Sequence, residues 1–323
     1  MSKKEIEHDT LGNRQKSYEE LSTSRRLMPN CPIYARIDGR AFHTFCHGLK
    51  KPYSKAFIEA MQQTCKYLVK ETTAILGYVQ SDEISLGWTD SQHCPFDGRV
   101  QKLESVLASM AGAKFVYKIV RGMFNWDAAD EYDINTMVAQ VDKAPPCFDC
   151  RVFNVPNMEE LANAFLWREN DAIKNSISGM ALNFYSHKEL QNKNSDEKIH
   201  MMRMKGYSFY EETEEAFLRG TFWHREDYLK DLNKEEVNRM PEKQRGNLLH
   251  DVETDIATGK IVHEQWACWR SRIAKMDIPY RLTNIENKVD VLFRGAEAIL
   301  SKDNPTFDLS KNAKMRIFLK PKE

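Results

Sequence analysis

Hydrophobic and polar positions alternate along residues 33–38, and this period of two predicts a β-strand that ends at Asp38. Gly39 follows at once, where a backbone without a Cβ atom can turn sharply and approach a ligand closely. The apolar positions of residues 57–69 then recur at helical spacing, which predicts an amphipathic helix with Ser54 as its N-cap.

Two strand-like runs within residues 77–88 (GYVQSDEISLGW) flank the polar stretch from Gln80 to Glu83, which predicts a β-hairpin with acids at its tip. A second helix is expected from about Arg99, a further strand over 148–155, and two consecutive helices from Asn157 to about His187. Together these elements predict an α+β fold, an antiparallel sheet covered by helices on one face.

Residues 224–260 are dense in charge and poor in large apolar side chains, so we place a domain boundary near their start. The expected core domain is 1–225. The expected second part is 226–323, a helical appendage with a lysine-rich, basic tail.

The composition is that of an ordinary globular protein, with 41% hydrophobic and 29% charged residues. The chain contains no apolar run long enough to span a bilayer, and its charged N-terminus lacks the apolar segment of a secretory signal, so we expect a cytoplasmic protein without a membrane partner. The seven cysteines form no disulfide framework, and the pair Cys147 and Cys150 has no second pair at zinc-ligand spacing, which favours ordinary thiols over a metal site.

The 47 basic and 47 acidic residues give a formal net charge of zero, so any RNA-binding surface has to be a local patch. The acids at Asp38, Asp82 and Glu83 suggest a specific chemistry. Two-metal phosphoryl transfer needs carboxylates that converge from separate elements. On spacing alone, the same acids also fit an ordinary turn and a solvated hairpin tip.

Several separated motifs resemble the signature of the tRNA(His) guanylyltransferase superfamily, enzymes that extend RNA in the 3′–5′ direction. They are RIDGRAFHTF (36–45), Lys51-Pro52, QSDEISLGW (80–88), FDCRVF (148–153), LWRENDAIKNSIS (166–178) and FYSHKEL (184–190). The resemblance covers about residues 30–225 and implies a catalytic domain with a polymerase-palm-like fold.

The resemblance also implies roles for individual residues. Asp38, Asp82 and Glu83 would be catalytic, and two Mg²⁺ ions would be held by Asp38, the Gly39 carbonyl and Asp82. The nucleotide would be bound by Asp38, Gly39, Arg40, Ala41, Phe42, His43, Lys51, Ser81, Asp82, Arg99 and Lys102. Without the resemblance, Arg99 and Lys102 would be assigned to a solvated helix face. RNA contacts are expected at Asn175 and Lys188.

Residues 173–179 (IKNSISG) lack the histidine of the HINNLYN stretch carried by enzymes dedicated to tRNA(His). The chain therefore resembles the guanylyltransferase-like branch, which implies Mg-dependent addition of nucleotides to the 5′ end of tRNA or tRNA-like RNA, a 5′-end repair that uses ATP and GTP or other nucleoside triphosphates. One alternative is a dedicated tRNA(His) guanylyltransferase that adds G at position −1. A second is a non-catalytic RNA-binding protein on a palm scaffold. By analogy with the family we expect a homotetramer, a dimer of dimers.

Overall fold

A computed structural model describes residues 10–122, 131–245, 248–254, 261–278 and 281–293. The chain divides into two compact units. The first contains residues 1–224 and 275–289, and the second contains residues 225–274 and 290–323.

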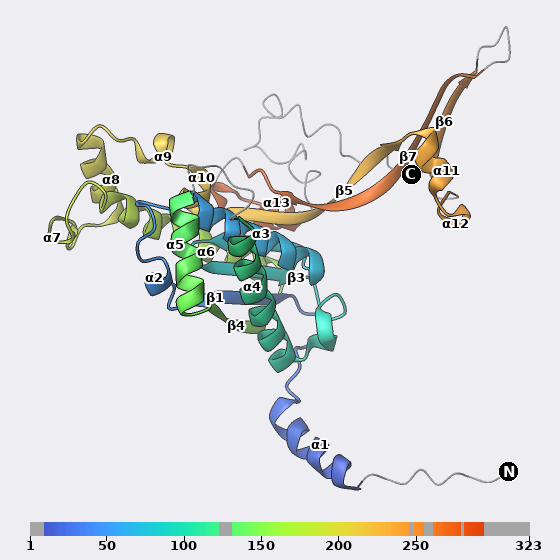
Figure 1. Cartoon of the computed structure of the whole chain (residues 1–323), viewed down its shortest axis with the longest axis horizontal. Coiled ribbons are helices and arrows are strands. Elements are labelled where there is room, and N and C mark those ends of the chain that lie inside the picture. Colours follow the sequence, from blue (N-terminus) through green and yellow to red (C-terminus); the bar gives the residue numbers. More distant parts are fainter. Residues whose placement is uncertain (1–9, 123–130, 246–247, 255–260, 279–280, 294–323) are drawn as a thin grey trace. The chain divides into compact units, whose positions relative to one another are not determined.

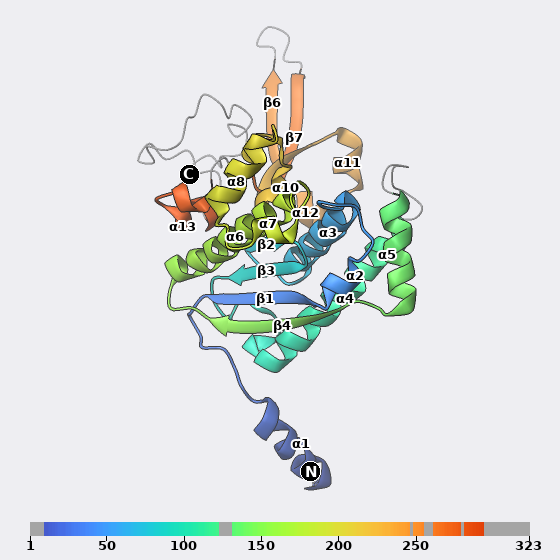
Figure 2. The same cartoon turned by 90° about the vertical axis from the view of Figure 1, so that its left-hand side faces the viewer.

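The strands of the described chain form a sheet with the order β4-β1-β3-β2-β5-β7-β6. Strand β1 pairs antiparallel with β3 and β4, and β2 pairs antiparallel with β3 and β5 (Figure 2). Their bounds are β1 Ile33–Arg40, β2 Leu76–Gln80, β3 Glu83–Trp88, β4 Cys147–Asn154, β5 Thr221–Leu232, β6 Leu249–Thr254 and β7 Ile261–Lys275. The predicted antiparallel α+β core is confirmed.

Helices cover both faces of the sheet in the first unit, whereas the sequence predicted helices on one face (Figure 2). A Cβ added to Gly77 of β2 would strike Val69 and Cys65, so α3 packs against that face. The ring of Phe165 on α6 contacts Tyr34 of β1 on the other face. The helices are α1 Thr10–Thr23, α2 Phe42–Phe45, α3 Lys55–Glu71, α4 Val100–Gly122, α5 Glu131–Lys143, α6 Met158–Ala181, α7 His187–Leu190, α8 Ser195–Met204, α9 Phe209–Glu212 and α10 Glu215–Arg219.

Two of these helices differ from the sequence-based expectation. Helix α1 forms in the N-terminal stretch, where the sequence pattern predicted no helix or strand. A single helix, α6, runs for 24 residues where two consecutive helices were expected, and its N-cap is Asn157, whose side chain accepts from the Glu160 N–H. No described helix is long and apolar enough to cross a bilayer.

The antiparallel registers define two ends of the sheet. At one end, which we call the carboxylate end, β1 finishes at Arg40 while β3 and β4 begin at Glu83 and Cys147. At the other, the distal end, Ile33 lies opposite Trp88 and also opposite Asn154 on the other neighbouring strand.

Helix α4 runs from the distal end toward the carboxylate end. Glu104, near its start, accepts a hydrogen bond from the Val152 N–H in the distal half of β4. Phe115, farther along, packs edge-on against Phe148 near the start of β4. Residues just before α4 therefore lie at the distal end.

The expectation of a helical appendage over 226–323 is wrong for much of the second unit. The second unit contains the end of strand β5, all of β6 and most of β7, and β6 pairs antiparallel with β7 (Figure 1). Short helices do occur at α11 (Lys234–Arg239), α12 (Glu242–Arg245) and α13 (Lys288–Phe293). The predicted basic tail lies outside the described residues.

The reason is that strand pairing supplies backbone hydrogen bonds without a continuous apolar stripe, so a charge-dense segment can form a two-sided ribbon. The apolar side chains that remain form a small cluster of Leu232, Val237 and Cys268, with Trp266 and Met240 packed against it. The predicted boundary between 225 and 226 falls beside the first junction of the units, but residues 275–289 return to the first unit.

Candidate active site

The fold brings Asp38 and Asp82 together at the carboxylate end. Asp38 lies directly opposite Glu83 in the β1–β3 register, and the Gly39 N–H donates to the Asp82 carbonyl at 3.0 Å. The turn between β2 and β3 is only two residues long, and Ser81 adopts a left-handed backbone with φ 47°. The tight turn therefore holds Asp82 beside the end of β1.

Asp38 and Asp82 place two carboxylates close together at this end of the sheet. Within the described part of the chain, neither carboxylate lies within 4.0 Å of a basic side chain. Burial raises the pKa of Asp82, hydrogen bonds from the turn backbone and from Ser81 oppose that shift, and the negative charge of Asp38 raises the pKa further. The repulsion between two adjacent anionic groups destabilises the folded protein, and a bound cation would offset that repulsion.

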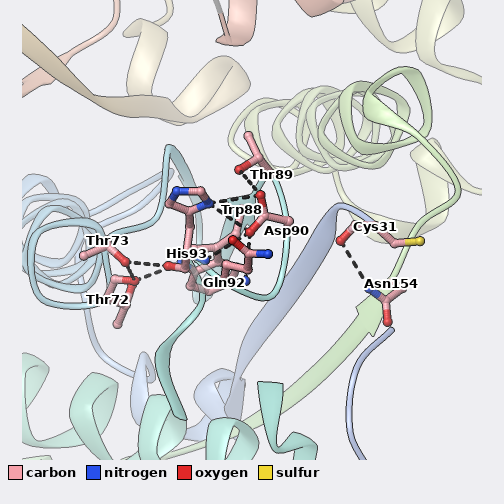
Figure 3. Close-up of polar contacts among 9 residues, drawn as sticks. All are labelled: Cys31, Thr72, Thr73, Trp88, Thr89, Asp90, Gln92, His93 and Asn154. Carbon is pink, nitrogen blue, oxygen red and sulfur yellow. Dashed lines mark hydrogen bonds and ion pairs between the residues drawn. The ribbon is translucent and has the colours of Figure 1, made fainter. Parts of the chain in front are cut away.

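Asp90 at the distal end shows the opposite arrangement (Figure 3). Its carboxylate accepts from the backbone N–H groups of Gln92 and His93 and lies 2.9 Å from the His93 ring Nδ1. Slight burial acts to raise the pKa of Asp90, but the hydrogen bonds from His93 outweigh it and lower the pKa. Asp90 is thus a satisfied structural acid, unlike Asp38 and Asp82.

Glu83 is also satisfied, by a buried ion pair with Arg168 of α6. The Arg168 Nε and Nη2 atoms donate to the two Glu83 oxygens at 2.6 and 2.8 Å. Burial raises the pKa of Glu83, and these two hydrogen bonds oppose the shift. The pair fastens the first residue of β3 to α6, so Glu83 positions the turn that carries Asp82.

The residues at this end fit a magnesium site with few protein ligands. No group of three or more His, Cys, Asp or Glu side chains in the described residues could hold a metal by itself. Magnesium keeps several waters and is commonly bound by one or two carboxylates together with substrate phosphates. Two adjacent, unpaired carboxylates suit that ion, whereas zinc would require more protein ligands.

A pocket opens beside the Ser81 turn, between the loop before α3 and the side of α6. Lys50, Lys51 and Ser81 contribute polar groups to its lining. The pocket is also lined by Cys46, Leu49, Pro52, Tyr53, Ser54, Phe57, Ile58, Gln80, Ala172, Asn175, Ser176, Gly179, Ala216 and Phe217. A largely apolar cavity with two lysines and several hydroxyl groups suits a nucleotide, whose base is flat and whose phosphates are anionic.

Cys46 links the pocket to the aspartates. Burial, together with the negative charge of Asp82, raises the pKa of its thiol to about 12, and the positive charge of Lys51 opposes that shift. The predicted residues Lys51, Ser81 and Asp82 are therefore close to one another, as the sequence-based assignment requires.

The segment after Asp38 is divided between surface and core. Arg40, Ala41 and His43 are exposed, and Ala41 has a left-handed backbone (φ 58°, ψ 32°) where the chain turns into α2. Of the predicted nucleotide-binding residues, Phe42 can face a nucleotide only with its backbone, because its ring is 2% exposed and packs among aromatic rings. These belong to Phe45, Phe57, Phe115 and Phe148.

Arg99 and Lys102 do not reach this site within one chain. Arg99 precedes α4 and bridges to Arg26 at the distal end, and Lys102 lies in the first turn of α4 with its ammonium 4.9 Å from the Phe96 ring centroid. A single chain therefore does not bring Arg99 and Lys102, both predicted to bind the nucleotide, to the end of the sheet that carries Asp38 and Asp82, because α4 starts at the far end.

The predicted RNA contacts are both exposed. Asn175 lines the pocket and donates to Asp171 at 3.3 Å, while Lys188 lies on α7. Arg168 received no role from the sequence, although it stands in the motif LWRENDAIKNSIS. A basic residue within a helix gives no local sign of a partner 85 positions away.

Comparison with known proteins places this geometry in context. Residues 12–156 match the family model described as Thg1, tRNAHis guanylyltransferase. The tRNA(His) guanylyltransferase of Schizosaccharomyces pombe is 30% identical over 224 residues, which cover 65% of this chain and 78% of that protein. An uncharacterised protein of Acanthamoeba polyphaga mimivirus is 25% identical over 210 residues, covering 61% of this chain and 70% of the viral one.

Two solved structures of bacterial proteins are also similar. A bacterial tRNA(His) guanylyltransferase (Thg1)-like protein in complex with ATP has a TM-score of 0.56 and 33% identity, covering 67% of this chain and 88% of that one. A bacterial protein of the same description in complex with GTP has a TM-score of 0.52 and 27% identity, covering 83% of this chain and 91% of that one.

Proposed function

This chain belongs to the tRNAHis guanylyltransferase family and is a nucleotidyltransferase, and we propose that it uses magnesium to add nucleotides to the 5′ end of a tRNA in the 3′–5′ direction. The observation that carries the proposal is the pair Asp38 and Asp82, adjacent, without a basic partner, and beside a pocket that contains lysines. A retired scaffold would have no reason to keep two unpaired acids together.

In this proposal Asp38 and Asp82 hold the magnesium ions, with the Gly39 carbonyl as a further ligand. Bound magnesium supplies the positive charge that stabilises the attacking and leaving oxygens of a phosphoryl transfer. Lys51 neutralises phosphate oxygens at the mouth of the pocket, Ser81 donates to them, and the apolar lining holds the base. The Glu83–Arg168 pair keeps the Asp82 turn in place.

Two RNA specificities are candidates. The names of the relatives favour addition of a guanylate to tRNA(His). The stretch IKNSISG over residues 173–179 and the likeness to Thg1-like proteins solved with ATP and with GTP favour broader, template-dependent 5′-end repair. Asn175 of that stretch lines the pocket, so the departure from the tRNA(His) signature falls at the site itself.

The test is a transfer assay with 5′-monophosphorylated tRNAs that lack their 5′ nucleotide, each labelled nucleoside triphosphate in turn, and Mg²⁺. Addition of G alone to tRNA(His) supports the dedicated activity, and addition of any nucleotide that pairs with the opposite base supports repair. Transfer should fall by at least about a thousandfold in Asp38→Asn and in Asp82→Asn, the scale of losing charge stabilisation in a transition state.

Asp90→Asn is the matched control, because Asp90 is an acid just past the end of β3, at the distal end, with its own hydrogen-bond partners. It should keep near wild-type transfer. Near wild-type rates in Asp38→Asn or Asp82→Asn would refute the site. RNA binding without transfer of any nucleotide in the wild type would support a non-catalytic RNA-binding protein.

The predicted triphosphate role of Arg99 and Lys102 requires a second copy of the chain, since both lie at the distal end. The predicted homotetramer would provide such copies. Mixing inactive Asp38→Ala and Arg99→Ala chains should then restore part of the transfer, because mixed oligomers contain a site with both residues intact. No recovery on mixing would rule out this sharing.

A further inference from the structure

Side chains of three kinds form successive rows across β4, β1 and β3 on the α6 side of the sheet. The first row is acidic, with Asp149 and Glu83 on either side of Asp38. The next pairs Arg151 with Arg36, and the third pairs Phe153 with Tyr34. Moving away from the carboxylate end, the surface thus changes from acidic to cationic to aromatic.

The outer part of these rows is open to solvent. Strand β4 ends the strand order, and Asp149, Arg151 and Phe153 are all exposed, with Phe153 at 40%. Trp167 on α6 is 52% exposed, an unusual position for the largest aromatic side chain. The Arg36 guanidinium carbon lies 5.6 Å from the Trp167 ring centroid, so the tryptophan stands beside the cationic row.

The cationic row is incompletely neutralised. Arg151 and Arg36 face each other directly, and like charges opposite each other destabilise a sheet. The Arg36 Nε atom is buried and has no hydrogen-bond partner in the described chain, because the nearest Glu83 oxygen is 3.9 Å away. Arg151 lies 3.6 Å from Asp149, but both are more than half exposed, and such a pair is weak.

We propose that this surface, formed by Arg36, Arg151, Phe153 and Trp167 and called here the β4 face, binds the single-stranded end of the RNA substrate. A nucleobase stacks on Trp167, and a backbone phosphate lies between Arg36 and Arg151, one row from Asp38. Exposed aromatic rings flanked by arginines are the usual means of holding single-stranded nucleic acid. The proposal rests on the proposed function for the identity of the ligand.

The test is equilibrium binding of a short, 3′-labelled, 5′-monophosphorylated oligoribonucleotide to the full chain by fluorescence anisotropy, without nucleoside triphosphate, at several salt concentrations. Trp167→Ala should weaken binding by about 5- to 150-fold, the effect of losing one stacked base. Trp167→Phe should recover much of it. Arg151→Gln should reduce the slope of log affinity against log salt by about 0.7, the value for one phosphate of a single strand.

Tyr117→Ala and Arg121→Gln are the matched controls, because both side chains are exposed on α4, which packs on the other face of the sheet. Both should bind RNA like the wild type. Two outcomes would overturn the proposal. One is an RNA affinity of Trp167→Ala within twofold of that of Tyr117→Ala, and the other is a change in the oligomeric state of Trp167→Ala without a loss of RNA affinity.

The transfer assay separates this inference from the proposed function. Normal RNA affinity of Trp167→Ala in a chain that transfers nucleotides would remove the β4 face and leave the enzyme. Affinity that depends on Trp167 in a chain that transfers no nucleotide would keep the β4 face and remove the enzyme. Circular dichroism of each variant shows that it is folded before its affinity is compared.

Discussion

Replacing Arg168 by methionine tests whether the α6 ion pair fastens the catalytic turn. The side chains of Arg168 and Glu83 are 9% and 6% exposed, and two short hydrogen bonds join them. Methionine keeps most of the aliphatic volume but removes both hydrogen bonds to the buried Glu83 carboxylate and leaves Arg36, whose Nε atom is 3.9 Å away, as a weaker counter-charge. Breaking such a pair costs about 3–5 kcal/mol of unfolding free energy.

The assay is urea unfolding followed by circular dichroism, for Arg168→Met, Glu83→Gln and the double variant. The double variant should be more stable than the sum of the single changes predicts, by about 1–3 kcal/mol, because it leaves no unpaired charge. Nucleotide transfer should also fall in Arg168→Met, since the turn that carries Asp82 loses its anchor.

The pH dependence gives a separate check. Without Arg168, burial holds the pKa of Glu83 in the folded protein above its unfolded value of about 4.3. The destabilisation is then fully present above the folded pKa and disappears as the pH falls below the unfolded one. An Arg168→Met variant within about 1 kcal/mol of wild type at neutral pH, or strict additivity of the two changes, would refute the reasoning.

Three further outcomes are expected. Gly39→Ala should lower the free energy of unfolding by about 1–3 kcal/mol in a thermal unfolding experiment, because the added Cβ would lie 2.4 Å from the Phe42 ring. Gly112→Ala is the control and should be neutral or stabilising, because the nearest atom to its added Cβ is 3.6 Å away. Arg219→Met should cost about 3–5 kcal/mol in urea, because it strips the counter-charge from the fully buried Glu169. A small cost would show that Glu169 is held by other contacts. Chelation of divalent ions should abolish nucleotide transfer and leave the far-ultraviolet spectrum unchanged, and transfer that persists would exclude a metal requirement.

Local pattern was sufficient for the elements that carry the proposed metal ligands. Alternation over 33–38 and the acid tip of the hairpin correctly place Asp38 in the last part of β1, which runs two residues further than predicted, and Asp82 in the β2–β3 turn. The N-caps at Ser54 and Asn157 are found where the sequence predicts them. These features depend on neighbours within a few positions, so a single sequence contains the information.

Only the tertiary structure decided which distant side chains meet. The pairing of Glu83 with Arg168, the burial of Phe42 and the distal location of Arg99 depend on how strands and helices pack, which periodicity does not report. The strands of the second unit likewise form because each finds a partner strand, although their own residues are polar enough for several conformations. Register places Arg151 beside Arg36, and no motif within either strand specifies that contact.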